Sequence, residues 1–479
     1  MITLTDMFCG AGGSSTGAIQ VPGVSVRLAM NHWDLAIETH NTNHPDADHA
    51  LADISAADPR RYPKTDILWA SPECTNHSVA RGKKRNADST PDLFGETLPD
   101  EAADRSRATM WDVPRFAEHH RYRAIITENV VDAARWVLFP AWLQAMALLG
   151  YEHQVVYLNS MHAQAAGLPA PQSRDRMYVV FWLKGNRAPD LNRWTRPHAY
   201  CSTCDETVTA MQGWKKPQPW GRYRFQYVWR CPNVACRNAV VEPAWLPASS
   251  AIDWNIEGER IGDRDRPLAA KTMARVQAGL DKFCAPFTAE VAGNTFERRP
   301  GVRTWSVDDV LRTLHTTPSK ALLVPAGGTW NESATSVNDV MRARTTRENE
   351  GLLVPVEGRD GKVAASTAEP MRTMTTRNET AFVVPMRANN VPKLVEQPYD
   401  TFAANGNHHG LALAQSISID DCQFRMLSPT EITRGMAFTE GYVMLGTKRE
   451  QVRLAGNAVT PPAARDLVSA VAESLGVAA

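Results

Sequence analysis

The sequence predicts a doubly wound α/β fold with a mostly parallel sheet, and three observations lead to this prediction. Short apolar strands alternate with helix-like segments over residues 1–185, a pattern typical of a sheet covered by helices on both faces. Three of these strands run into glycine, cysteine or glutamate, at the edge where open α/β sheets bind ligands. The chain has 479 residues, more than one core usually holds, so we expect two or three domains.

The first predicted strand covers residues 1–8, where apolar and polar residues alternate, and a glycine-rich turn follows it. This turn contains Gly10, Gly12 and Gly13 and leads into a helix-like segment. Glycines between a strand and a helix let the backbone approach a ligand closely, and a helix N-terminus favours a carboxylate or phosphate. The spacing differs from the G-x-G-x-x-G of dinucleotide-binding proteins. The turn is nevertheless a candidate cofactor loop.

A second apolar run, Ile67 to Ala70, predicts a short buried strand, and Cys74 lies in the turn after it. A lone cysteine in such a turn is more often an inert core residue than a nucleophile. The polar composition of residues 75–110 predicts a mobile lid, with an unstructured surface insertion as the alternative. The lid interpretation gains from a basic cluster that suits phosphate contacts, formed by Arg81, Lys83, Lys84 and Arg85.

A third strand, residues 124–127, ends in a carboxylate, that of Glu128, which Asn129 and Val130 follow. A glutamate at the end of a strand usually faces solvent. This one comes after a candidate cofactor loop and a candidate nucleophile in chain order, so it becomes a candidate site residue.

Together these stretches resemble the DNA cytosine-5 methyltransferase family, of the bacterial or phage type. The resemblance rests on Phe-x-Gly-x-Gly-Gly from Phe8, on the Cys74 loop and on Glu-Asn-Val from Glu128. Residues 172–176 read as the family's Gln-x-Arg-x-Arg, and residues 425–431 and 456–459 match its C-terminal motifs. These motifs stand in the family's order; they cover roughly residues 1–185 and 420–479 and leave the middle of the chain uncovered.

The resemblance implies a Rossmann-like methyltransferase fold, S-adenosylmethionine as cofactor, double-stranded DNA as substrate and a place in restriction-modification. It implies that Cys74 adds to carbon 6 of a flipped-out cytosine, while Glu128, in its protonated form, holds ring nitrogen 3. Arg174 would hold the carbonyl of the base, with Arg176 completing the catalytic group. The residues implied for the cofactor are Phe8, Gly10, Gly12, Gly13, Trp33, Asp53, Ile54 and Asn457.

Two positions depart from the family pattern. Glu73 stands immediately before the candidate nucleophile, where the family usually has proline, and His32 replaces an acidic residue expected to bind the cofactor ribose. We interpret both as variation within the family. Asp53 either contacts the cofactor adenine, as the resemblance implies, or caps a helix.

The composition is that of a soluble globular protein, with 43% hydrophobic residues and equal numbers, 52 each, of basic and acidic residues. A zero net charge excludes a protein coated in basic charge, but a nucleic-acid enzyme needs only a local basic cleft. We find no apolar run of membrane-spanning length and no leader-like N-terminus. A cytoplasmic monomer is expected.

Two cysteine pairs predict a structural zinc site in residues 199–247. They form C-x2-C and C-x4-C spacings, and their members are Cys201, Cys204, Cys231 and Cys236. Free thiols are the alternative. Between the pairs, residues 214–224 interleave aromatic and basic residues, which suits either nucleic-acid contact or a packed ribbon with solvated charges.

Residues 248–420 are predicted to be β-rich and to recognise the target, and an internal repeat lies within them. Apolar segments that end at Pro325, Pro355 and Pro385 recur every 30 residues. Arg347 and Arg377 occupy equivalent Thr-Thr-Arg places and could reach phosphates or guanine edges; a scaffold is the alternative. Residues 421–479 would then complete a catalytic domain that begins with residues 1–198.

Two other functions stay open at this point: the same chemistry on RNA, and a catalytically inactive DNA-binding homologue. The presence of Cys74, Glu128, Arg174 and Arg176 argues against the inactive homologue, because decay would strike those residues first.

Overall fold

The computed structural model describes residues 1–73, 108–270, 272–274, 276–277, 287–290, 303–312, 320–325, 382–385, 409–412 and 418–477. Several predicted site residues lie outside the described residues, namely Cys74, Arg81, Lys83, Lys84, Arg85, Arg347 and Arg377. Among the helices that are described, none combines the length and the apolar character needed to cross a membrane.

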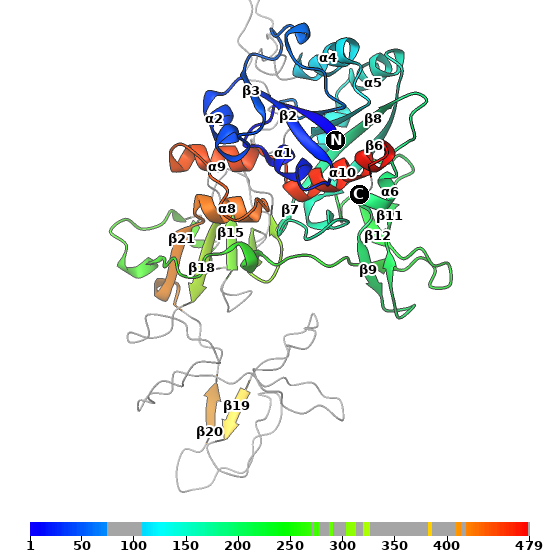
Figure 1. Ribbon diagram of the computed structural model, residues 1–479. Helices are drawn as coiled ribbons and strands as arrows, with labels where there is room; N and C mark the ends of the chain where they lie inside the picture. The colour runs from blue at the N-terminus through cyan, green and yellow to red at the C-terminus, as the bar shows by residue number, and fades with distance from the viewer. Residues whose placement is uncertain are drawn as a thin grey trace, which may run out of the picture.

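A seven-stranded sheet forms the centre of the molecule, with the strand order β3-β2-β1-β4-β5-β8-β6 (Figure 1). The strands from β3 to β5 are mutually parallel, and β8 is antiparallel to both of its neighbours. The predicted doubly wound, mostly parallel sheet is therefore confirmed. The strands are β1 (Ile2–Met7), β2 (Val24–Asn31), β3 (Asp48–Leu51), β4 (Ile67–Ala70), β5 (Ala124–Asn129), β6 (Tyr151–Asn159) and β8 (Asp175–Leu183).

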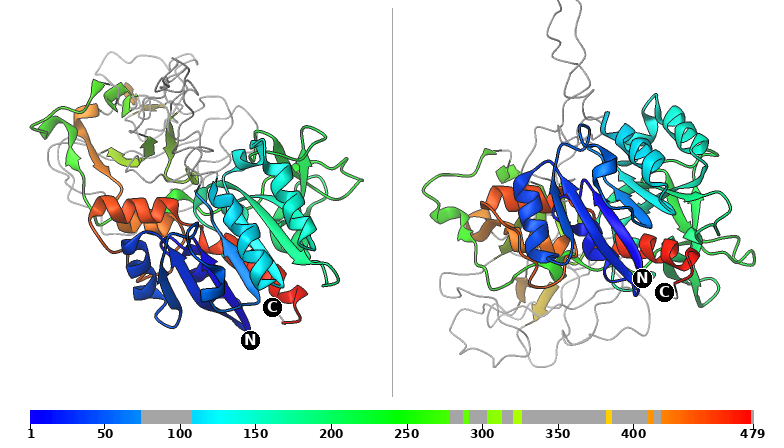
Figure 2. Two further views of the ribbon diagram at one scale, coloured as in Figure 1. Left: turned by 90° about the horizontal axis from the view of Figure 1, so that it is seen from above. Right: turned by 45° about the horizontal axis from the view of Figure 1, so that its top comes forward.

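Apolar side chains on both faces of the sheet hold the two helical layers. Along β4, Ile67 and Trp69 belong to one core cluster, whereas Leu68 and Ala70 belong to another, as the period of two in a strand requires. The first cluster includes residues of α10 (Pro461–Ser474), and the second includes residues of α4 (Asp112–His120) and α5 (Phe139–Leu148). The two helical layers are seen on opposite sides of the sheet in Figure 2.

The C-terminal segment packs against the N-terminal sheet, as the sequence predicts. Helix α10 lies against α1 (Gly13–Ala18), at two glycines that leave room for its backbone. A methyl group on Gly13 would overlap the carbonyl of Val459, and one on Gly17 would overlap the carbonyl of Pro461. These two glycines therefore serve the close approach of chain segments that are far apart in sequence.

The region between these two parts is built from small sheets. One hairpin pairs β10 with β9, and a three-stranded sheet has the order β11-β12-β13. Their strands are β9 (His198–Cys201), β10 (Glu206–Thr209), β11 (Met211–Trp214), β12 (Tyr227–Arg230) and β13 (Val240–Val241). A five-stranded sheet has the order β14-β21-β18-β15-β16. Its strands are β14 (Glu259–Arg260), β15 (Phe287–Glu290), β16 (Thr304–Ser306), β18 (Lys320–Pro325) and β21 (Cys422–Met426).

Two of the predicted repeat strands are described, and both end at their prolines. Strand β18 ends at Pro325, and β19 (Phe382–Pro385) pairs antiparallel with β20 (His409–Ala412). The middle repeat strand, which ends at Pro355, lies outside the described part of the chain. The prediction of apolar strands that end at proline is confirmed for the first and third copies.

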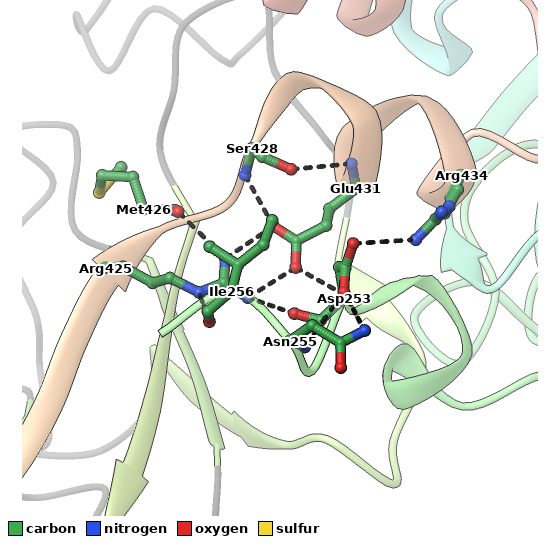
Figure 3. Close-up of polar contacts among 8 residues, drawn as sticks. All are labelled: Asp253, Asn255, Ile256, Arg425, Met426, Ser428, Glu431 and Arg434. Carbon is green, nitrogen blue, oxygen red and sulfur yellow. Dashed lines mark hydrogen bonds and ion pairs between the residues drawn. The ribbon is translucent and has the colours of Figure 1, made fainter. Parts of the chain in front are cut away.

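A buried ion pair lies within the C-terminal motif of residues 425–431, and the backbone of Asp253 in the middle region binds both of its members (Figure 3). Arg425 binds Glu431 through two contacts of 2.7 Å, and both the amide of Asp253 and the amide of Ser428 donate to the same carboxylate. Burial of Glu431 opposes its ionisation, but these donors, Arg425 first, outweigh burial and lower its pKa. Ser428 and Glu431 also form the capping box of α8 (Pro429–Gly435). The motif thus has a structural role.

Candidate active site

The candidate site lies at the carboxyl edge of the sheet, where three chain segments meet. Met7 at the end of β1 pairs with Met30 of β2 and with Ala70 of β4, and Ala70 pairs with Thr127 of β5. The amide of Ser71 donates to the carbonyl of Met7 at 3.1 Å. The glycine loop, the segment that leads to Cys74 and the Glu128 segment therefore leave the sheet side by side.

A further hydrogen bond fixes the segment just before the candidate nucleophile. The side-chain amide of Asn129 donates to the carbonyl of Pro72 at 3.3 Å. Asn129 is buried and is the neighbour of Glu128. The backbone two residues before Cys74 is thus tied to the strand that carries the candidate acid.

The glycine loop has the backbone that its composition predicts, and its glycines serve different purposes. Phe8, Gly10 and Gly12 all have positive φ, of 63°, 52° and 84°. Nothing lies within 4 Å of the place where a side chain on Gly10 would start, whereas one on Gly12 would meet the hydroxyl of Tyr442 at 2.6 Å. Gly10 therefore borders open space that a cofactor can occupy, and Gly12 makes room for the C-terminal segment.

A buried polar network lies behind this loop, and no sequence pattern predicts it. The carboxylate of Asp6 accepts hydrogen bonds of 2.6 Å from the hydroxyls of both Ser14 and Ser15. His40 binds Ser15 at 2.9 Å and His49 at 2.8 Å. Burial raises the pKa of Asp6 to about 6, despite the serine hydrogen bonds, and burial lowers the pKa of His40.

A second histidine, His44, links the network to the C-terminal part of the chain. It lies 3.1 Å from the hydroxyl of Thr16 and 3.4 Å from that of Tyr442, which also donates to the carbonyl of Ala11. Burial lowers the pKa of His44 to about 4. The two histidines that support the glycine loop, His40 and His44, therefore stay uncharged near neutral pH.

The two positions that depart from the family pattern face each other. His32 follows β2, and its Nε2 atom lies 3.9 Å from a carboxylate oxygen of Glu73. Next to it, Trp33 precedes α2 (Asp34–Asn43), and the guanidinium of Arg453 lies 4.5 Å from the centre of its indole ring. An acidic group therefore does stand near the expected ribose position, but it comes from the residue before Cys74.

Asp53 and Ile54 are accounted for locally. The exposed carboxylate of Asp53 accepts a hydrogen bond of 3.1 Å from the amide of Ser55 and so caps the turn that follows. Ile54 is buried in the core on the α4 side of the sheet. Asp53 thus caps a turn and not the helix predicted as its alternative role, because the next helix, η1 (Pro59–Arg61), is capped by Asp58. A cofactor contact of Asp53 stays a prediction.

Glu128 and Arg176 form an ion pair at this edge. The Nε atom of Arg176 lies 2.7 Å from the Glu128 carboxylate, and the side chains are only 15% and 11% exposed, respectively. Strands β5 and β8 are antiparallel neighbours, with Glu128 opposite Tyr178. Arg176, two residues before Tyr178, therefore projects from the same face of the sheet as Tyr178.

Arg174 is placed differently, although only one residue separates it from Arg176. It is 2% exposed, and its guanidinium donates to the carbonyls of Gly456 and Ala458 at 3.1 Å each. These residues end helix α9 (Lys448–Asn457) and flank Asn457, whose side chain is exposed. Arg174 thus fixes the C-terminal motif beside the sheet, and a contact with substrate stays a prediction.

The four predicted metal ligands are brought together. Their sulfur atoms all lie within 4.8 Å of one another, with 3.9 Å between Cys201 and Cys236 and 3.9 Å between Cys204 and Cys231. A tetrahedral zinc site with Zn–S bonds of about 2.3 Å has sulfur atoms about 3.8 Å apart. The cluster therefore has the spacing of a four-cysteine metal site.

The aromatic residues between the cysteines are mostly packed. Trp214 lies against Tyr157 of β6 and Tyr227 of β12, with ring centres 5.6 Å and 5.0 Å away. Trp220 packs against the core on the α4 side of the sheet, whereas Phe225 is exposed. For the two tryptophans, the structure supports the packed ribbon over a surface for stacking bases.

Comparison with known proteins agrees with this geometry. Residues 2–218 match the family described as C-5 cytosine-specific DNA methylase, in agreement with the resemblance found in the motifs.

Two curated relatives are similar over a limited length. The type II methyltransferase M.AgeI of Thalassovita gelatinovora is 30% identical over 196 residues, 38% of this chain and 40% of that protein. M.SsoII of Shigella sonnei, also a type II methyltransferase, is 27% identical over 185 residues, 38% of this chain and 42% of that protein. The chain thus matches about two fifths of the length of each.

Among solved structures, the chain is similar to the methyltransferase EhMeth of Entamoeba histolytica, with a TM-score of 0.48 and 9% identity over 100% of this chain and 99% of that one. A DNMT2 variant from Spodoptera frugiperda gives a TM-score of 0.48 and 11% identity, over 99% of each chain.

Proposed function

We propose that this protein transfers a methyl group from S-adenosylmethionine to carbon 5 of cytosine in double-stranded DNA. The observation that carries the proposal is the meeting of three segments at one edge. The Glu128–Arg176 pair stands beside the backbone that leads to Cys74, and the glycine loop leaves the neighbouring strand. The match of residues 2–218 to the C-5 cytosine-specific DNA methylase family supports the same reaction.

The residues at the edge fit the cofactor. Open space at Gly10, a loop with positive φ and the ring of Trp33 would receive the adenosyl group and the amino acid part, with Phe8 beside them. When bound, S-adenosylmethionine supplies an electrophilic methyl group on a sulfonium.

The chemistry then falls to the side chains of this chain. The target cytosine leaves the duplex, and the thiolate of Cys74 adds to carbon 6, which makes carbon 5 nucleophilic. Glu128 donates a hydrogen bond to ring nitrogen 3 and so stabilises the adduct. After methyl transfer a base removes the proton from carbon 5, and the thiolate leaves carbon 6.

We assign the contact with the carbonyl oxygen of the base to Arg176 instead of Arg174. Arg176 lies against the carboxylate that would hold the base, so its guanidinium is within reach of the same ring. Arg174 holds the carbonyls of Gly456 and Ala458 and serves as a positioning residue for the C-terminal motif.

The proposal is tested by bisulfite sequencing of DNA from cells that express the protein, with the Cys74→Ser variant as the control. We expect 5-methylcytosine at a recurring sequence with the wild-type protein and none with the variant. Bisulfite sequencing of RNA from the same cells tests the alternative substrate, and methylation of RNA alone would overturn the assignment to DNA.

We also propose that the cysteine cluster holds one structural zinc ion. The spacing of the four sulfur atoms supports a tetrahedral site. Metal analysis of protein purified without chelator should give about one zinc per chain. Less than about a tenth of an equivalent would favour free thiols.

Residues 248–420 are proposed as the target-recognition region, with residues 199–247 as a separate ribbon and residues 421–479 as the completion of the catalytic domain. In this scheme Arg347 and Arg377 contact DNA from the repeat, and the basic cluster of residues 81–85 contacts phosphates from the lid.

A further inference from the structure

The connection between β11 and β12, residues 215–226, is seated on the segment that follows the candidate acid. The indole nitrogen of Trp220 donates to the carbonyl of Val131 at 3.1 Å. The guanidinium of Arg135 lies 3.5 Å from the centre of the same indole ring. Val131 and Arg135 are the two ends of a short 3-10 helix, η4 (Val131–Arg135), which begins three residues after Glu128.

A second residue of this connection makes an ion pair with the same helix. The Nη2 atom of Arg222 lies 2.5 Å from the carboxylate of Asp132, and both side chains are mostly buried. An ion pair that is shielded from water in this way holds its partners more firmly than one on the surface.

The connection also reaches the strand that carries Arg176. The amide of Tyr223 donates to the carboxylate of Asp175 at 3.0 Å. Asp175 stands between Arg174 and Arg176, and burial raises its pKa to about 6, with the amide of Tyr223 among the groups that oppose the rise. Residues 215–226 therefore bind the segment that follows Glu128 in the chain, through Val131 and Asp132. They also bind Asp175, the residue before Arg176.

The cysteine cluster closes the base of the hairpin that presents this connection. Strand β12 ends at Arg230, which pairs with Met211 of β11, and Cys231 follows directly. Cys231 and Cys236 lie with Cys201 and Cys204 of the preceding hairpin. A metal on these four sulfur atoms would fix the base of a hairpin whose far end contacts the catalytic segments.

We propose that the metal-closed ribbon is a positioning clamp for the Glu128–Arg176 pair, and that Trp220 and Arg222 are its contact residues. The inference rests on the proposed function. Neither residue is expected to touch substrate; each acts through η4, and the Tyr223 amide acts through Asp175. A displacement of about 1 Å at a catalytic group costs up to about 100-fold in rate, so loss of the clamp should lower kcat without weakening cofactor binding.

The test compares Arg222→Ala with a matched control, Arg193→Ala. Arg193 pairs with Glu473 at 2.6 Å, between α6 (Leu191–Thr195) and α10, away from the catalytic segments. We expect Arg222→Ala to lower kcat about 10- to 100-fold with the KM for S-adenosylmethionine within twofold. Arg193→Ala should keep the wild-type kcat, and Arg222→Lys, which retains the charge, should restore part of the loss.

The metal is tested with Cys204→Ser, because a thiol reagent would also attack Cys74. Loss of zinc should lower kcat as Arg222→Ala does, and the double variant should lose no more than either single variant, since both act through one contact. Additive losses, or an unchanged kcat in Arg222→Ala, would overturn the clamp.

Amide hydrogen exchange of residues 131–135 gives a readout that does not depend on activity. We expect faster exchange in this segment in both Arg222→Ala and Cys204→Ser, and no change in Arg193→Ala. Unchanged exchange on loss of the metal would overturn the coupling. If the wild-type protein methylates neither DNA nor RNA, the proposed function fails, whereas the exchange experiment still decides whether the ribbon holds this segment.

Discussion

At the β1–β2 end of the carboxyl edge the chain is tied by hydrogen bonds among groups whose burial opposes ionisation, whereas at the β5–β8 end it is tied by ion pairs. Asp6, His40 and His44 lie behind the glycine loop, with pKa values moved toward their neutral forms. At the other end Glu128 pairs with Arg176, and Asp132 pairs with Arg222. Under the proposed function, the β1–β2 end would receive the cofactor and the β5–β8 end would hold the target base.

The difference shows that the two ends of one sheet edge can differ in what disturbs them, either a change of pH or the loss of one side chain. The cofactor end should respond to pH through groups whose burial opposes ionisation. The base end should respond to the removal of single partners, because an ion pair that loses one member leaves a charge without compensation.

The largest effect is expected at the point where the two ends meet. Cys74→Ser should reduce methyl transfer below detection, because a hydroxyl is a far weaker nucleophile than a thiolate at neutral pH. Binding of S-adenosylmethionine, measured by calorimetry, should stay within twofold. Wild-type rates in this variant would refute the assignment.

DNA that contains 5-fluorocytosine should trap a covalent complex with the wild-type protein, visible as a shifted band on a denaturing gel.

Removing the candidate acid tests the base end alone. Glu128→Gln should lower kcat by about 100- to 1,000-fold, because general acid catalysis usually contributes on that order. The KM for S-adenosylmethionine should be little changed. Glu118→Gln, a change to an exposed carboxylate on α4, is the matched control and should retain wild-type activity. A loss of cofactor binding in Glu128→Gln would show that the two ends are not separate.

A buried carboxyl group behind the glycine loop should contribute to the pH dependence of stability. Burial raises the pKa of Asp6 to about 6, so the folded state binds this proton more tightly than the unfolded chain. Ionisation of Asp6 therefore lowers the free energy of unfolding as pH rises from about 4 to about 6. Asparagine cannot ionise, so the Asp6→Asn variant does not lose this stability. We expect the free energy of unfolding of Asp6→Asn, minus that of the wild type, to increase by roughly 2–3 kcal/mol from pH 4 to pH 7.

Urea unfolding across this range gives the measurement for Asp6→Asn. Wild type and Asp6→Asn are compared at each pH because His44 changes the free energy of unfolding with pH in the opposite direction in both proteins. Burial lowers the pKa of His44 to about 4, so its contribution to stability is lost as pH falls below about 6.5. A constant difference between wild type and Asp6→Asn at all pH values would contradict the assignment to Asp6.

The smallest effect is expected at the open glycine. Gly10→Ala should raise the Kd for S-adenosylmethionine about tenfold, because the added methyl group enters the space left for the cofactor. Gly441→Ala is a matched control, since Gly441 also has a positive φ, of 80°, and also has nothing within 4 Å of its added carbon. Equal affinities in the two variants would mean that the space at Gly10 is not used.

The sequence was a good guide where local patterns decide the structure. The order of apolar runs and the residues that end them predicted the sheet and the meeting of the glycine loop with Glu128, because parallel strands bring their carboxyl ends to one edge. Cysteine spacing likewise predicted the cluster, since two close pairs need only one approach between hairpins.

Contacts between distant segments could not be predicted in the same way. Nothing local distinguishes Arg174 from Arg176, yet one binds the end of α9 and the other binds Glu128. The approach of Arg222 to Asp132 depends on where the ribbon docks, and the network of Asp6 with His40 depends on how α2 packs. The basic residues between the cysteines were noted in the sequence. Their pattern fitted contact with nucleic acid and exposure to solvent equally well, so the ion pair of Arg222 could not be predicted from it.

The core on the α1 side of the sheet has a consequence for the order in which the protein can mature. Side chains of β1, β4 and β5 share that core with Trp194, and also with Val459 and α10. During synthesis at about 5–20 residues per second, the stretch between Trp194 and Val459 takes on the order of tens of seconds to emerge. During that interval the sheet face that includes Leu4, Ile67 and Ile126 is not yet covered by α10. The nascent chain therefore exposes an apolar surface to chaperones until α10 has left the ribosome.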